Sequence, residues 1–86
     1  MAAPDPRVLS ATTTQGSFAI GSGISDFILK NVGNDNVYID FDADIDANSY
    51  LLSAGETMNF TNITFTRLMY KADSSTATLY IILVKQ

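Results

Sequence analysis

The stretch of the chain best suited to chemistry is an acidic run with carboxylates at every second position: Asp40, Asp42, Asp44 and Asp46. On an extended chain, side chains two residues apart point to the same face, so all four carboxylates would share one side. Ca²⁺ takes oxygen ligands of this kind. The EF-hand pattern fails, because the sixth position counted from Asp42 is Ala47 and the twelfth is Ser53. The run therefore fits either a weak calcium site or a solvated acidic loop.

The 86 residues contain no histidine and no cysteine. Catalytic arrangements built on imidazole or thiolate are therefore excluded, as are metal sites of that type. A pair of carboxylates in an acid-rich loop also lacks the apolar setting that raises the pKa of a general acid. From the residues alone we expect no enzyme activity and no cofactor.

Aromatic residues admit two interpretations. The four tyrosines, with the five phenylalanines, would make a platform for a sugar or a protein partner: Tyr38 and Tyr50, which flank the acidic run, and Tyr70 and Tyr80. Alternatively, the aromatic side chains belong to a β-sheet, with Phe on its inward face and Tyr half-buried. The platform interpretation, together with the acidic run, predicts a small carbohydrate- or calcium-binding module.

The charge and the hydropathy of the chain limit the kinds of partner that it can bind. The formal net charge is −4, the isoelectric point is near 4.2, and there are only five Lys and Arg. Neutralisation of nucleic-acid phosphates is therefore not expected. No apolar run approaches the roughly 20 residues of a membrane helix, and the first seven residues lack the pattern of a signal peptide. We expect neither nucleic acid nor membrane as a partner.

The C-terminal stretch from Ala77 to Val84 is uncharged and apolar on both faces from Tyr80 onward. A strand with one face in water is polar on that face, so this strand should be central in a sheet or covered by another subunit. A chain of this size without disulfide or metal often gains stability by oligomerising. We therefore predict an interface with copies of the chain, or with a larger shell, at these side chains: Val8, Leu9, Tyr80, Ile82 and Val84.

Seven or eight short strands follow one another, with turn-forming residues every 8–12 positions. This pattern predicts an all-β, single-domain fold: an antiparallel β-sandwich, jelly-roll-like, or a β-barrel. Residues 1–11 contain Pro4 and Pro6 and are expected to form an extended N-terminal arm, followed by the sandwich domain over 12–86. Residues 25–41 are expected to form one hairpin, and residues 65–84 another through the turn at 72–75.

Three segments resemble small structural proteins of tailed bacteriophages: residues 29–42, residues 50–56 with Leu-Ser-Ala-Gly-Glu, and residues 69–81 with Ser-Ser-Thr-Ala. The chain departs from that pattern at Ser75, where Gly is commoner, and in its richer Asp run. The resemblance implies a non-enzymatic virion component, most simply a capsid decoration (cement) protein or a head or tail accessory protein. Its partners would be copies of itself and other phage capsid or tail proteins, and it would reach the virion after synthesis in the host cytoplasm.

Overall fold

A computed structural model describes residues 4–21 and 23–85 of the chain. In this part the chain forms strands and no helix, so no helix is present there that could cross a membrane. The strands are β1 (Asp5–Ala11), β2 (Gly16–Ala19), β3 (Ser25–Asn31), β4 (Val37–Phe41), β5 (Tyr50–Leu52), β6 (Thr57–Ile63), β7 (Arg67–Ala72) and β8 (Ala77–Lys85).

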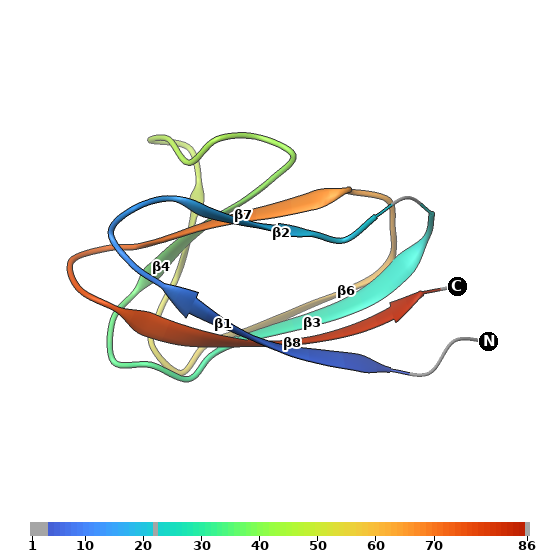
Figure 1. Cartoon of the computed structure of the whole chain (residues 1–86), viewed down its shortest axis with the longest axis horizontal. Helices are drawn as coiled ribbons and strands as arrows, with labels where there is room; N and C mark the ends of the chain where they lie inside the picture. Colours follow the sequence, from blue (N-terminus) through green and yellow to red (C-terminus); the bar gives the residue numbers. More distant parts are fainter. Residues whose placement is uncertain (1–3, 22, 86) are drawn as a thin grey trace.

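The strands form two four-stranded sheets that pack face to face (Figure 1). Sheet A has the order β1-β8-β3-β6 and sheet B the order β2-β7-β4-β5, and the paired strands are antiparallel. Successive strands alternate between the sheets except for β4 and β5, which pair with each other. This is the strand order of a jelly roll. The predicted all-β antiparallel sandwich is confirmed.

Two predicted hairpins are wrong. Strand β3 lies in sheet A and β4 in sheet B, so the turn after Asn31 carries the chain from one layer to the other. The turn after Ala72 does the same between β7 and β8. Apolar and polar residues alternate along both strands at such a corner, as they do in a hairpin. The sequence pattern therefore does not distinguish a hairpin from a turn that crosses between sheets.

The predicted N-terminal arm is replaced by a strand over most of its length. Residues 5–11 form β1, which pairs with β8 from Asp5 opposite Leu83 to Ala11 opposite Ala77. Strand β1 is an edge strand, the kind of strand in which Pro such as Pro6 is found, because there a missing backbone N–H can face solvent. Residues 1–3 of the predicted arm lie outside the described residues.

The core lies between the two sheets and is built from their inward-facing residues. Strand β8 is central in sheet A, between β1 and β3, as its apolar character predicts. Its inward side chains Leu79 and Ile81 are buried, whereas its outward side chains Tyr80 and Ile82 are exposed. Sheet B supplies the opposing layer with Val37, Ile39, Leu52 and Leu68.

One end of the sandwich is held by a buried amide. The Asn31 side chain donates to the carbonyl oxygens of Asp35 and Leu52, and its Oδ1 accepts from the backbone N–H of Gly33 at 3.0 Å. The carboxylate of Asp35 in turn accepts from the backbone N–H of Ser74 at 2.9 Å and from its hydroxyl. These bonds tie the two cross-layer turns and β5 to one another.

Candidate functional site

The four carboxylates of the acidic run do not form a common site. Three of them have separate partners: the Ser49 hydroxyl for Asp40, the Gln15 amide for Asp44 and the Asn48 backbone N–H for Asp46. Among residues 4–21 and 23–85, no three acidic side chains come close enough together to hold a metal ion. The structure therefore favours the loop interpretation over a calcium site.

Asp42 has a different role from the other three carboxylates. Its carboxylate accepts hydrogen bonds from the Thr66 hydroxyl at 2.8 Å, the Thr66 backbone N–H at 3.0 Å and the Arg67 backbone N–H at 2.8 Å. The Thr66 hydroxyl is the largest cause of a lowered Asp42 pKa, and the two backbone N–H groups add to it. Asp42 has a positive φ of 57°, a conformation that Asp tolerates better than most residues. Asp42 thus clamps the end of β4 to the start of β7.

This clamp brings together two phenylalanines, one on each side of it. Phe41 precedes Asp42 and Phe65 precedes Thr66, and the two rings meet with centroids 4.7 Å apart at an interplanar angle of 61°. Phe41 also packs edge-on against Phe60 of β6, at 5.6 Å. Buried Phe27 completes the cluster, with its ring centroid 5.3 Å from that of Phe65 and 6.3 Å from that of Phe60.

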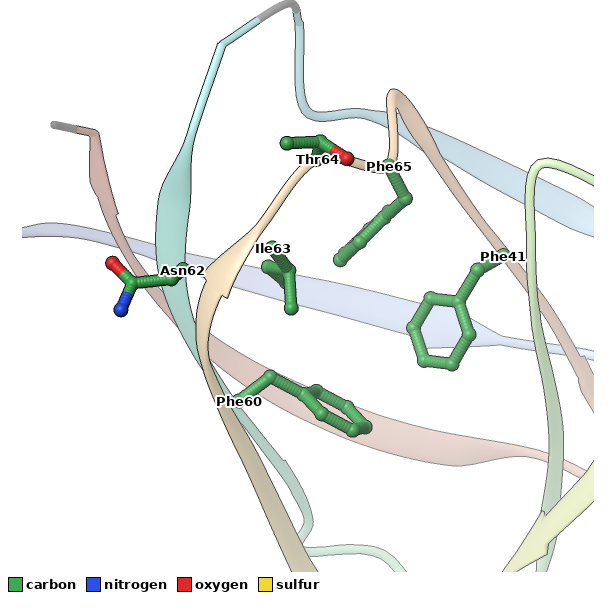
Figure 2. Close-up of a pocket in the computed structure, with 6 residues that line it drawn as sticks. All are labelled: Phe41, Phe60, Asn62, Ile63, Thr64 and Phe65. Carbon is green, nitrogen blue, oxygen red and sulfur yellow. The ribbon is translucent and has the colours of Figure 1, made fainter.

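A hollow of about 370 Å³ opens beside these rings, and we term it the phenylalanine pocket. It is lined by Phe41, Phe60, Asn62, Ile63, Thr64 and Phe65. In Figure 2 the three rings and the Ile63 side chain converge, whereas the Asn62 side chain points away from them.

The pocket lies beside the part of β4 that β5 does not cover. Strand β5 pairs with β4 only from Val37 to Ile39, so it stops before Phe41. Beyond that point the edge of sheet B does not continue alongside β6, and the space between the sheets is open to the side. The sequence places Phe60 on an inward face, but it does not show where β5 ends relative to Phe41. This is why the pocket is absent from the sequence-based prediction.

A buried hydroxyl lies behind one wall of the pocket. Ser25 is 1% exposed, and its Oγ has no hydrogen-bond partner within the described part of the chain. It stands opposite Ile63 in the pairing of β3 with β6. The Ser25 hydroxyl is therefore a buried polar group on β3, directly across the strand pair from Ile63 of the pocket lining.

The two platform tyrosines that flank the acidic run, Tyr38 and Tyr50, do not lie on one surface. Tyr38 alternates with buried Ile39 along β4 and faces outward, while Tyr50 stands directly opposite Ile39 and shares its face. Each hydroxyl has a local partner, the carboxylate of Asp73 for Tyr38 and that of Glu56 for Tyr50, and these bonds raise the pKa of both phenols. The two side chains therefore do not form one binding surface.

The predicted interface residues divide between two faces of sheet A. Val8, Tyr80 and Ile82 are exposed on the outer face, and half-buried Val84 follows the same alternation. Leu9 points inward and packs against the core, so it does not belong to this surface. The reason is the alternation of β1, which places Leu9 opposite buried Leu79.

No protein-family model and no curated protein matches the sequence significantly. Solved structures do match. A cupin protein from Bacteroides fragilis superposes with a TM-score of 0.70 at 15% identity, over 99% of this chain and 68% of that one. A sugar phosphate isomerase of the cupin superfamily from Silicibacter pomeroyi gives 0.67 at 8% identity, over 96% of this chain and 51% of that one. The putative ethanolamine utilization protein Q of Salmonella typhimurium gives 0.64 at 6% identity, over 95% of this chain and 58% of that one.

These matches correct two expectations from the sequence. The prediction of a non-enzymatic phage structural protein is wrong, because the matched structures are cupin-fold proteins and not virion components. The prediction that the chain is no enzyme loses its basis as well, since one matched cupin is described as an isomerase. The resembling segments are turn and strand motifs of a jelly roll, an architecture that viral capsid proteins and cupins share.

At these identities the likeness concerns the fold alone. The chain spans only about half to two thirds of the length of the structures that it matches. Their activities therefore do not transfer to it by similarity. What the comparison shows, together with the strand order, is that this chain has the jelly-roll fold of the cupins.

Proposed function

We propose that this domain binds a small, uncharged, apolar or aromatic molecule in the phenylalanine pocket. The observation that carries the proposal is the lining: three phenylalanine rings and Ile63 converge on a hollow of about 370 Å³ between the sheets. Pockets for small molecules typically measure about 300–1,000 Å³ and are predominantly apolar and aromatic. The cupin-like fold is compatible with small-molecule binding in general, because a cupin among the matched structures is described as a sugar phosphate isomerase.

The lining also limits the class of ligand. None of its six residues is acidic or basic, so none would form an ion pair with a phosphate or a carboxylate. It offers no carboxylate, imidazole or thiolate, so a metal ion does not fit there. A flat, apolar molecule that stacks against the rings suits this lining better than a sugar phosphate does.

Binding is testable with the neutral fluorophore N-phenyl-1-naphthylamine, whose emission rises in an apolar site. Ile63→Asp places a charge in the pocket wall and should weaken binding about tenfold or more, because the charge must stay hydrated. The matched control is Ile24→Asp, since Ile24 is 45% exposed and lies outside the lining. Binding that is saturable in the wild type and in the control, but weakened in Ile63→Asp, supports the proposal. No saturable binding by the wild type, or equal affinity in both variants, would overturn it.

A further inference from the structure

The outer face of sheet A carries a continuous apolar surface. Val8, Ile28, Tyr80 and Ile82 are 67%, 42%, 51% and 41% exposed. They are direct neighbours in the sheet, because Val8 stands opposite Tyr80, and Ile28 opposite Ile82. Single exposed apolar side chains are ordinary on a protein surface, whereas a contiguous group on three adjacent strands marks an interaction site. We term these four residues the apolar row.

Two opposite charges border the apolar row on β3. Lys30 stands opposite Tyr80 at one end, and Asp26 stands opposite Val84 at the other, with Ile28 midway between them. The Asp26 carboxylate accepts a hydrogen bond from the backbone N–H of Asn62 at 3.0 Å, which helps to fix its position. The two charges cancel, so the surface as a whole does not select a strongly charged partner.

We propose that a second copy of this chain covers this face, in a symmetric dimer whose two-fold axis passes over Ile28 and Ile82. Such an axis lies between sheet A of one copy and sheet A of the other and runs across the strands. It reverses the strand direction in the second copy. Each Lys30 then lies over Asp26 of the second copy, and each Tyr80 over Val84 of the second copy. The same operation that places Ile28 and Ile82 over their own copies therefore also forms two ion pairs, and an isologous interface repeats each contact in this way.

The size of the face sets the expected strength of the dimer. Four strands about 4.8 Å apart, each about seven residues long at about 3.3 Å per residue, give a footprint on the order of 400 Å². A standard stable interface buries about 800 Å² of accessible surface per partner. We therefore expect a reversible dimer with a dissociation constant in the micromolar range or weaker.

Sedimentation equilibrium of the full chain, up to about 1 mM, tests the proposal directly. The wild type should dimerise, and Ile28→Asp should be monomeric with an unchanged circular dichroism spectrum, because it places two charges against each other at the axis. The matched control Leu51→Asp alters a 38% exposed residue of β5 in sheet B and should remain dimeric. A wild type that is monomeric throughout would overturn the proposal and leave this face to another partner. A dimer that Ile28→Asp leaves intact would also overturn it.

The register of the two copies can be tested separately, without placing a charge in the apolar row. Lys30→Glu and Asp26→Lys should each weaken dimerisation, because every contact then joins like charges. Mixing the two variants should restore dimers, since both contacts in a mixed pair join opposite charges. If each variant dimerises as strongly as the wild type, or if the mixture stays monomeric while both variants are folded, the proposed register is wrong.

Discussion

The Asp42 carboxylate accepts two hydrogen bonds from Thr66, one from the backbone N–H at 3.0 Å and one from the hydroxyl at 2.8 Å. These bonds join the residue after β4 to the residue before β7, and so they hold Phe41 beside Phe65 at the mouth of the phenylalanine pocket. The most regular acidic run in the sequence thus contributes a structural clamp rather than a metal site.

Asp42→Asn should lower the melting temperature and weaken binding in the pocket. Asparagine keeps the size of the side chain and tolerates the positive φ, so the variant removes mainly the charged acceptor of three hydrogen bonds. Asp44→Asn is the matched control, because Asp44 lies in the same loop and accepts only an exposed bond from Gln15. Thermal melts of both variants check this. Equal melting temperatures for the two variants would mean that the clamp contributes nothing.

Acid should destabilise the protein through its hydrogen-bonded carboxylates. The pKa values of Asp35, Asp42 and Glu56 are all lowered, mainly by hydrogen bonds from Ser74, Thr66 and Tyr50 respectively. A lowered folded-state pKa gives stability that is complete above the unfolded-state value, about 4, and is lost as the pH falls through the folded-state value. Urea unfolding from pH 7 to pH 2 should therefore show the free energy of unfolding flat at first and falling below about pH 4. In the double variant Asp35→Asn, Asp42→Asn the free energy of unfolding should fall less steeply with decreasing pH. An unchanged slope would show that these two carboxylates do not cause the loss of stability in acid.

Much of the strand pattern is predictable from local sequence. The alternation Val37, Ile39, Phe41 gives β4 with its bounds and its inward face, and the uncharged C-terminal stretch gives β8 as a central strand. Both results depend only on side-chain periodicity, which a single strand displays without reference to its neighbours.

Pairing is not predictable in the same way, because it depends on contacts between distant residues. The turn after Asn31, which crosses between the sheets, is tied to the turn after Ala72 by the hydrogen bond from the Ser74 hydroxyl to Asp35, 39 positions away. A Cβ on Gly33 would lie 2.8 Å from the Ala77 backbone, so the two turns also pack directly on each other. Two of the three segments that resemble phage proteins contain these turns, and the third, residues 50–56, contains β5. The turns specify jelly-roll corners, whereas the pocket depends on how far β4 extends beyond β5, which the turn and strand motifs do not show.

Asn31→Ala should cost about 2–3 kcal/mol of stability, because it leaves three buried or half-buried backbone groups without their partner. The control Asn34→Ala changes an exposed residue of the same turn and should stay within about 0.5 kcal/mol of the wild type. Chemical unfolding of both variants measures the difference. A loss below about 1 kcal/mol for Asn31→Ala would show that the turn is held mainly by other contacts.

Ser25→Ala should leave stability unchanged or raise it by about 1 kcal/mol, since it removes a buried hydroxyl that has no hydrogen-bond partner in the described chain. Ser74→Ala is the contrasting variant, because its hydroxyl donates to Asp35 and its loss should destabilise the turn. The melting temperature of Ser74→Ala should fall below that of the wild type, whereas that of Ser25→Ala should not. A clear loss of stability in Ser25→Ala would show that its hydroxyl is bonded in solution.

Binding of an apolar molecule in the phenylalanine pocket can be observed by NMR with indole as the probe and ¹³C-labelled phenylalanine and isoleucine side chains. We expect saturable shift changes and intermolecular NOEs from indole to the rings of Phe41, Phe60 and Phe65 and to the Ile63 methyl groups. NOEs to the apolar row on the outer face of sheet A, with none to these rings, or no saturable shifts at all, would contradict it.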